Sequence, residues 1–249
     1  MVDSISKKDI KKLWGRSHNR CALPECRRKL IVDKTASDAE AVIGEMAHIK
    51  GEKPDASRYD LTQSDNERNG YDNRILVCGG CHTLIDKQPK TYTVDKLHEI
   101  KHNHEKWADS KLEEELMNVT FAELNVVTKY LMIGTTNVST DLSLISPDEK
   151  IRKNGLSTQT AHLITMGMLQ VKQVTDYISR SPDPEFGERL KQGFINEYIR
   201  LKDKEHLSGD DIFDALLMFA SGGNNDFKVK AAGLSVLVYL FEKCEVFEK

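Results

Sequence analysis

Apolar positions in the first hundred residues recur at two different spacings. Within residues 6–17 they fall at i, i+3 and i+4, the spacing of one face of a helix, with Ser6 as the predicted N-cap. Shorter apolar runs, which predict strands, cover residues 29–32, 41–50 and 75–77. Helical patterns return at residues 79–87 and after Thr93, where Leu97, Ile100 and Trp107 would share one side. Helices and short strands therefore alternate here, around polar loops at 19–28 and 51–71.

Beyond residue 115 the strong patterns are helical. TFAE, residues 120–123, is a capping-box pattern that opens a helix reaching about residue 133. Further helices are predicted at residues 157–179, 185–204, 208–220 and 226–247. Ser208 and Asp211 resemble another N-terminal cap, and GGNN at 222–225 is a break. By composition TTNVST, residues 135–140, is the best linker, so we divide the chain into segments 1–110, 111–140 (a helical connector and linker) and 141–249.

Charge differs between the two halves of the 249-residue chain. Up to Trp107 there are 20 Lys and Arg against 17 Asp and Glu, and the remainder holds 16 against 22. Ten basic residues bunch between Lys7 and Lys34, where they could face a phosphate backbone or form a solvated helix face and loop. The chain shows neither a signal-peptide pattern nor an apolar run long enough to span a bilayer. We expect a cytoplasmic protein without a membrane partner.

The five cysteines fall into two close pairs and one single residue. Cys21 and Cys26 form one pair, and Cys78 and Cys81 form the other. In a reducing compartment, paired cysteines are better explained as metal ligands than as disulfides, and four thiolates suit a tetrahedral structural Zn²⁺. The alternative is that they are small buried hydrophobes. Cys244, in an apolar terminal helix, is predicted to lie in the core.

His82 directly follows the second cysteine pair, in CGGCH. On a helix, residues three apart share a face and the next residue is rotated by about 100°. Cys78 and Cys81 would thus face the zinc, and His82 would point elsewhere. The candidate partner is GEMAHIK, residues 44–50, a strand that ends in His48.

The order His48, Asn73, His82, with AHI, DNRILVC and CHTLID around these residues, resembles the HNH endonucleases of the ββα-metal class, in their zinc-ribbon variety. The resemblance covers residues 12–107. It implies an α+β, zinc-stabilised ββα-metal nuclease domain that hydrolyses DNA with a catalytic Mg²⁺ or Mn²⁺. His48 would be the general base and His82 a metal ligand. Asn73 would orient His48 or brace the loop.

One position departs from this family. Many members carry an acidic residue or a histidine directly before the base, whereas this chain has Ala47. Alternate residues of a strand project to the same side, so Glu45 is the predicted replacement ligand, with Asp72 as a second candidate.

Three further histidines, His98, His102 and His104, lie in the later helix. His104 and Lys101 could contact substrate phosphates, but an exposed helix surface is the plainer interpretation.

The back half has a resemblance of its own. ISPDEKIRKNGLS, residues 145–157, and VLVYLFEKCEVFEK, residues 236–249, resemble the C-terminal domains of effectors in ABC-three-component systems, the group that includes Lamassu-type phage defence. The resemblance covers residues 141–249. It implies an all-α docking domain for an ABC/SMC-like ATPase and a small middle subunit, and leaves homo-oligomerisation open. Without it, the last helix is simply apolar almost all round, and so buried in its own bundle or against a partner.

The sequence thus predicts a zinc-stapled HNH nuclease joined to a helical docking domain, the effector of an anti-phage complex. Two alternatives stay open. One is a noncatalytic zinc-stabilised DNA-binding adaptor, in which His48 and His82 serve structure. The other is a standalone HNH restriction nuclease.

Overall fold

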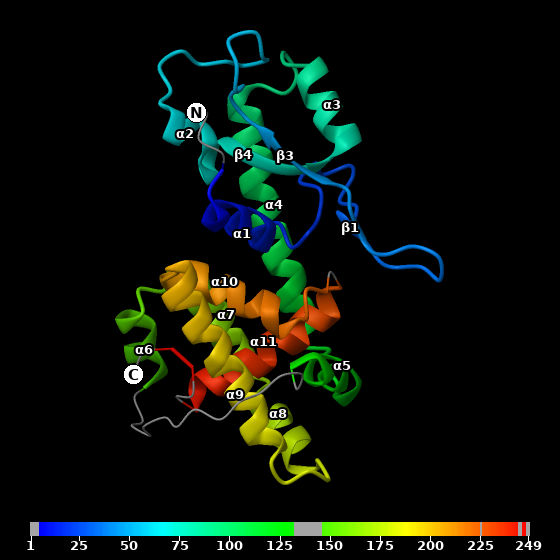
Figure 1. The fold of residues 1–249 in the computed structure, drawn as a ribbon, viewed down its shortest axis with the longest axis vertical. Helices are drawn as coiled ribbons and strands as arrows, with labels where there is room; N and C mark the ends of the chain where they lie inside the picture. The colour runs from blue at the N-terminus through cyan, green and yellow to red at the C-terminus, as the bar shows by residue number, and fades with distance from the viewer. Residues whose placement is uncertain (1–4, 132–145, 225, 244–245, 248–249) are drawn as a thin grey trace. The chain divides into compact units, whose positions relative to one another are not determined.

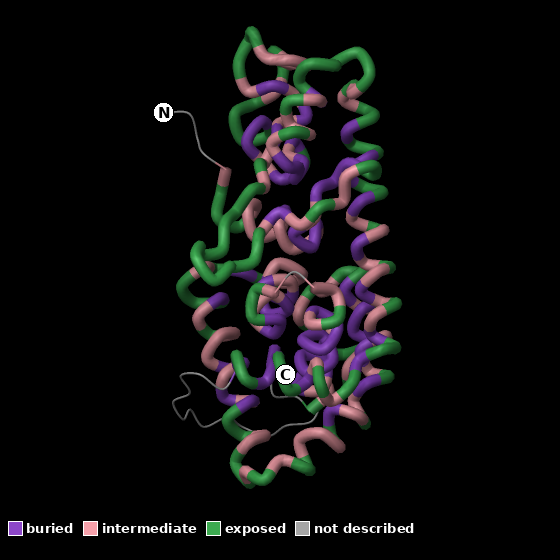
Figure 2. The backbone as a smooth tube through the Cα atoms, turned by 90° about the vertical axis from the view of Figure 1, so that its right-hand side faces the viewer, coloured by how far each residue is buried: buried purple, intermediate pink, exposed green. Residues whose placement is uncertain are grey.

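The computed structural model describes residues 5–131, 146–224, 226–243 and 246–247. It forms two compact units, Met1–Ser110 and Lys111–Lys249, each with its own hydrophobic core. The buried positions of each unit, purple in Figure 2, lie on the inner sides of its elements. Each unit is described by itself below.

The first unit begins with helix α1, Lys7–Arg16. The predicted N-cap is confirmed, because the Ser6 hydroxyl accepts a hydrogen bond of 3.0 Å from the Asp9 backbone N–H. Leu13 is the fully buried residue of this helix, and Trp14 packs partly buried against the core. The helix therefore joins the core through the predicted apolar stripe.

Two small antiparallel sheets follow (Figure 1). Strands β1, Ile31–Val32, and β2, Ala41–Val42, form one sheet, and strands β3, Gly44–His48, and β4, Arg74–Cys78, form the other. The prediction of one continuous strand at residues 41–50 is thus wrong. It is divided at Ile43, because its first part pairs with β1 and its second part with β4.

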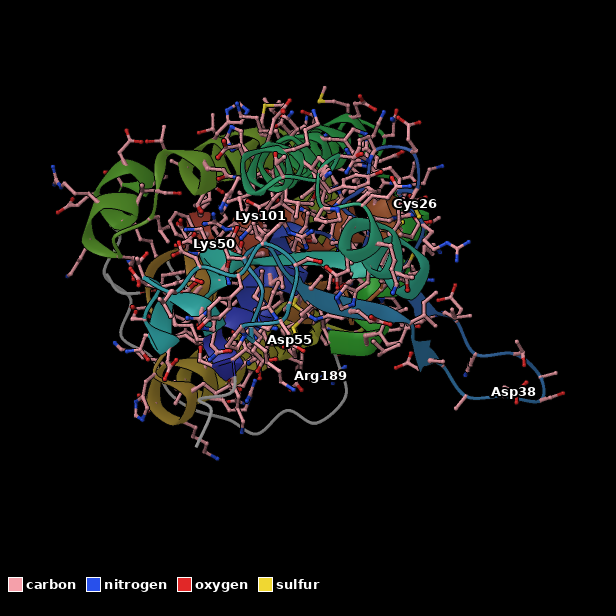
Figure 3. The ribbon with its side chains drawn as sticks, turned by 90° about the horizontal axis from the view of Figure 1, so that it is seen from above. Cys26, Asp38, Lys50, Asp55, Lys101 and Arg189 are labelled. Atoms are coloured by element: carbon pink, nitrogen blue, oxygen red, sulfur yellow. The ribbon has the colours of Figure 1, made fainter. Side chains whose placement is uncertain are left out.

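The connection between β1 and β2 is a solvent-exposed loop at residues 33–40. Figure 3 shows Asp38 at the outer end of this loop, which projects from the rest of the first unit. Val32 and Val42 are also largely exposed. This small sheet therefore contributes little to the core.

The predicted loop 51–71 contains a short helix, α2, Asp65–Asn69, and leads into a 3₁₀ turn, η1, Tyr71–Asn73. Helix α2 starts with a capping box, in which Ser64 and Glu67 bond each other's backbone N–H groups. Residues 64–67, SDNE, show the sequence pattern of this capping box, but the helix was not predicted. The rest of the loop is tied down by the buried side chains of two arginines, Arg58 and Arg68.

Helix α3, Gly79–Lys87, has the predicted bounds, and helix α4, Val94–Leu116, is longer than predicted. The predicted pattern ended at Trp107, and the polar stretch 109–115 forms the last turns of the helix. The reason is a narrow apolar stripe among the charges, since Ala108, Leu112 and Leu116 recur every four residues and are fully buried. Leu97 and Ile100 are buried as predicted, and Trp107 is only partly buried.

The described part of the second unit is helical. Besides the end of α4 its elements are α5 (Phe121–Leu131), α6 (Pro147–Lys153), α7 (Thr158–Met168), α8 (Val171–Ser179), α9 (Phe186–Ile199), the π-helical turn η2 (Arg200–Lys204), α10 (Gly209–Ala220) and α11 (Phe227–Glu242). The helix predicted at 157–179 is two helices, interrupted at Leu169 and Gln170. Helix α6 was not predicted. The proposed linker, residues 135–140, and Cys244 lie outside the described residues.

The two predicted caps of this unit differ in outcome. At α5 half of the predicted capping box is present, because the Glu123 carboxylate accepts from the Thr120 N–H at 2.9 Å, whereas the Thr120 hydroxyl accepts from the Ala122 N–H at 3.2 Å. Ser208 is the N-cap of α10, but its side chain makes no capping hydrogen bond. Asp210 instead accepts from the backbone N–H of Ser157 at 2.9 Å, which joins the start of α10 to the start of α7.

Helix α11 is the centre of the second unit. Residues 230–238 are buried without exception, and α11 packs against α5, α7, α8 and α10. Gly167 of α7 allows the closest approach, because a Cβ there would lie 2.6 Å from Cγ2 of Val238. The helix is therefore buried within its own unit, which was the first of the two alternatives for its apolar surface.

Among the described residues, no helix has the length and apolar character needed to cross a bilayer.

Candidate functional site

Four cysteines of the first unit converge on one point. The Sγ atoms of Cys21, Cys26, Cys78 and Cys81 all lie within 4.8 Å of one another, and those of Cys26 and Cys78 are 3.9 Å apart. All four are free thiols. A zinc ion with four thiolates at about 2.3 Å requires sulfurs roughly 3.8 Å apart. The cluster therefore fits a structural Zn²⁺, as the sequence predicts.

Backbone hydrogen bonds hold the two cysteine pairs together. The N–H of Cys21 bonds the Arg28 carbonyl, and the N–H of Ala22 bonds the Leu76 carbonyl of β4. The N–H of Cys78 points at the Cys21 sulfur at 3.4 Å. Such N–H donors stabilise thiolates, so the loop and strand form a preorganised metal site.

Burial sets the protonation of this cluster. It raises the pKa of Cys21 to about 11 and also raises the pKa of Cys81. At Cys78 burial acts in the same direction, but hydrogen bonds led by the Cys81 N–H outweigh it and lower the pKa. Because a metal binds the thiolate forms, metal binding has to release protons from this cluster.

The cluster also fixes where α3 starts. Cys78 is the last residue of β4 and the N-cap of α3, and Cys81 lies in the first helical turn. Both cysteines were predicted to lie on the helix, but only Cys81 does. The expectation for His82 holds geometrically, since its ring is directed to Glu45 and not to the sulfurs.

Glu45 of β3 and His82 of α3 form the central pair of the candidate site. The Nδ1 atom of His82 lies 2.5 Å from Oε2 of Glu45. Both side chains are partly exposed to solvent, 32% for His82 and 51% for Glu45. A Cβ at Gly79 would come 2.7 Å from Oε1 of Glu45, so glycine at that position leaves room for the carboxylate. The pair is a hydrogen-bonded carboxylate and imidazole, two groups that can also serve as metal ligands.

The other ring nitrogen of His82 faces a second carboxylate. Its Nε2 atom lies 3.3 Å from Oδ2 of Asp86, one turn further along α3. The second oxygen of Asp86 accepts a hydrogen bond of 2.8 Å from Arg58. The imidazole therefore lies between two carboxylates, and one of these is already neutralised by a guanidinium.

His48, the predicted base, ends β3 opposite Arg74 in the register of the sheet. Burial lowers its pKa below the ordinary value of 6.5, and the nearby charge of Arg74 lowers it further. Its Nε2 atom is buried and makes no hydrogen bond to any described residue. The imidazole is thus held in the neutral form that a general base needs.

Asn73 is buried and braces the chain just after His48. Its side chain accepts from the Lys50 N–H at 2.8 Å and donates to the carbonyls of Lys50 and Arg68, both at 2.9 Å. Of the two roles expected for Asn73, this is the bracing one. The amide that contacts His48 belongs to Asn69, and it opposes the lowering of the His48 pKa.

The remaining candidates lie apart from this pair. Asp72 and His98 line a cleft of about 650 Å³ with Tyr71 and Lys12. Lys101 and His104 are buried, so neither forms an exposed helix surface nor contacts a phosphate in this conformation. Lys101 donates to the Tyr71 carbonyl at 2.5 Å, and burial lowers its pKa to about 8.

His104 gives the first unit a sensitivity to acid. Its ring stacks on Trp107 and contacts the Arg27 guanidinium, and burial followed by the Arg27 charge lowers its pKa to about 3. The unfolded chain gains a proton on this histidine near pH 6.5, whereas the folded protein gains it only near pH 3. The fold therefore keeps its full stability above pH 6.5 and loses stability as pH falls from 6.5 toward 3. When complete, the loss is about 5 kcal/mol, from 1.36 kcal/mol per pKa unit.

We therefore expect His104→Gln, which cannot gain a proton, to flatten the decline in stability between pH 6.5 and 4.5. The measurement is the free energy of unfolding of both proteins against pH. Acid release of metal acts equally on both, so it cancels in their difference. Parallel curves would contradict the prediction.

Three residues around this site were not predicted from the sequence: Asp86, Arg58 and Asn69. Asp86 had a signal, because it follows His82 by one helical turn in HTLID. Arg58 and Asn69 had no such signal, since both lie in the predicted loop 51–71, where no apolar periodicity indicates which residues pack against the site.

The comparisons with known proteins concern the helical part of the chain. Residues 133–248 match the family model of C-terminal domain 10 (CTD10) of the ABC-three component (ABC-3C) systems. This part of the chain belongs to that family of domains, and the protein is accordingly a component of an ABC-3C system. Among curated proteins, none matches the chain.

Proposed function

We propose that the first unit is a metal-dependent HNH endonuclease that hydrolyses DNA phosphodiester bonds, and that the protein is the nuclease effector of an ABC-3C anti-phage system. The Glu45–His82 pair carries the proposal. It unites residues 37 positions apart at 2.5 Å, next to a cysteine cluster that fixes α3.

In this mechanism each residue has one task. Glu45 and His82 would hold a divalent ion, which supplies charge stabilisation for the phosphate and the leaving oxygen. His48, neutral because its pKa is lowered, would take a proton from the attacking water. Asn73 keeps the backbone after His48 in place through Lys50.

The CTD10 match makes the standalone nuclease the weaker alternative, because such a domain implies association with other ABC-3C components. The noncatalytic adaptor has one observation in its favour. Nε2 of His48 is buried in this conformation, and a base must reach its water. DNA binding without cleavage, both alone and in the assembled complex with ATP, would support that alternative.

The test of the proposal is Glu45→Gln, which keeps the size of the side chain and removes its charge. We expect plasmid cleavage with Mg²⁺ or Mn²⁺ to fall at least 100-fold, because a ligand to the ion is lost. Plasmid nicking and linearisation are followed over time, with and without the other ABC-3C components.

Glu40→Gln is the matched control, since Glu40 is an exposed residue of the loop before β2. It should cleave like the unmodified protein. A fully active Glu45→Gln variant would remove Glu45 from the metal site.

A further inference from the structure

Arg58 occupies a central place that the mechanism above does not use. Its side chain is only 5% exposed, although it comes from the long loop after β3. The guanidinium donates through Nε to the Ile49 carbonyl at 2.7 Å and through Nη1 to the Ile85 carbonyl at 2.7 Å. Its remaining nitrogen, Nη2, donates to Oδ1 of Asp86 at 2.8 Å. One side chain thus joins two elements of the candidate site.

The three acceptors lie at the ends of the elements that carry the site. Ile49 directly follows His48, and Ile85 and Asp86 lie one turn beyond His82 in α3. The side chains of Ile49 and Ile85 are fully buried, so their carbonyls are fixed by the core. Linking these carbonyls sets the spacing between the His48 and His82 backbones.

Helix chemistry explains why an arginine suits this position. The last carbonyls of a helix lack partners within it and carry partial negative charge. Arg58 satisfies one of them at Ile85, and the Ser57 hydroxyl donates to the Asp86 carbonyl at 2.8 Å. The planar guanidinium can serve three acceptors at once, which an ammonium on a lysine cannot do in the same geometry.

The backbone supports the same conclusion. Arg58 has a φ of +61°, in the left-handed region that residues with a side chain rarely adopt. Such a conformation persists where surrounding interactions over-determine it, and it clusters at functional sites. Here the hydrogen bonds of Ser57 and Arg58 hold it.

Asp86 connects the Arg58 guanidinium to the imidazole of His82. Its Oδ1 atom is bound to Arg58, and its Oδ2 atom lies 3.3 Å from Nε2 of His82. The ring is thereby turned so that Nδ1 faces Glu45. A cation would avoid the Asp86 side, where a buried guanidinium already neutralises the carboxylate, so the Glu45 side is the one left for a metal.

We infer that Arg58 is a positioning residue that sets the spacing of His48 and His82 and, through Asp86, the orientation of the His82 ring. The catalytic meaning of this positioning rests on the nuclease function proposed above. The positioning itself is a property of the fold and can be measured without cleavage.

The experiment compares the full chain with Arg58→Lys, Asp86→Asn and Arg68→Lys. Arg68 is the matched control, because its guanidinium bonds the carbonyls of Gly51, Asp60 and Gln63 in the same loop. Histidine side-chain ¹⁵N resonances report ring environment and tautomer, and Mn²⁺ titration reports affinity. Cleavage kinetics of the assembled complex give kcat and KM separately.

We expect Arg58→Lys to shift the resonances of both His48 and His82, and Asp86→Asn to shift those of His82 alone. Mn²⁺ affinity should fall 10- to 100-fold in both variants, as for other residues that orient a metal ligand, with kcat reduced and KM unchanged. Arg68→Lys should leave all three readouts as they are.

The outcomes separate the two proposals. Unchanged resonances in Arg58→Lys, or equal changes in Arg58→Lys and Arg68→Lys, would overturn the positioning role. Shifted resonances in a protein that never cleaves DNA would support positioning and refute the nuclease.

Discussion

Cys78→Ser is expected to release the zinc and to unfold the first unit. Cys78 ends β4, begins α3 and lies 3.9 Å by its sulfur from that of Cys26. A serine hydroxyl is not a thiolate ligand, and three remaining thiols cannot close the tetrahedral site. Structural zinc contributes about 10–16 kcal/mol in small metal-dependent domains at neutral pH, so the loss should exceed what the small sheets and core of this unit can replace.

Zinc content per chain and thermal unfolding measure this effect. We expect metal content to fall from one ion to none and the transition of the first unit to disappear. The second unit should still unfold cooperatively, because its core is a separate cluster of residues.

Cys244→Ser is the matched control. The cluster found among the described residues already supplies four sulfurs, so this variant should keep its zinc. A Cys78→Ser protein with full zinc content and unchanged unfolding would rule out the four-cysteine site.

His48→Ala is expected to remove DNA cleavage while leaving zinc content and folding intact. General-base catalysis contributes typically 10²- to 10⁴-fold, and His48 is the base of the proposed mechanism. We therefore expect a fall in kcat within that range, measured by plasmid cleavage with the other ABC-3C components present.

The pH dependence adds a second signature. A base must be neutral to act, and burial and Arg74 lower the His48 pKa. The rising acid limb of kcat should therefore lie below pH 6.5, and it should disappear in His48→Ala. His102→Ala, at an exposed position of α4, should keep both the rate and the limb. Undiminished cleavage by His48→Ala would assign the base elsewhere.

Local patterns in the sequence were enough to predict several of these features. The two cysteine pairs converge because their spacing is that of metal knuckles, and α3 follows β4 directly because CGGCH leaves no room for a loop. The placement of Glu45 followed from strand alternation, which puts it on the same side as Ala47.

Features that depend on contacts between distant segments could not be predicted. The strand is divided at Ile43 because its two parts pair with different strands, β1 and β4. An apolar run in the sequence does not indicate which strands it pairs with. The role of Arg58 depends on carbonyl groups of Ile49 and Ile85, which every residue possesses. Likewise, Asn69 and Asn73 have the same side chain, and only the fold determines that Asn69 is the one near His48.

Helix α3 is anchored at both ends, by the cysteine cluster at its start and by Ser57 and Arg58 at its end. A helix held in this way can neither slide along its axis nor rotate about it without breaking one anchor. His82 is therefore a fixed point, and an activating signal has little room to act by assembling the metal ligands. For the proposed nuclease we therefore expect control to act on access of the DNA strand to the site, and not on assembly of the Glu45–His82 pair.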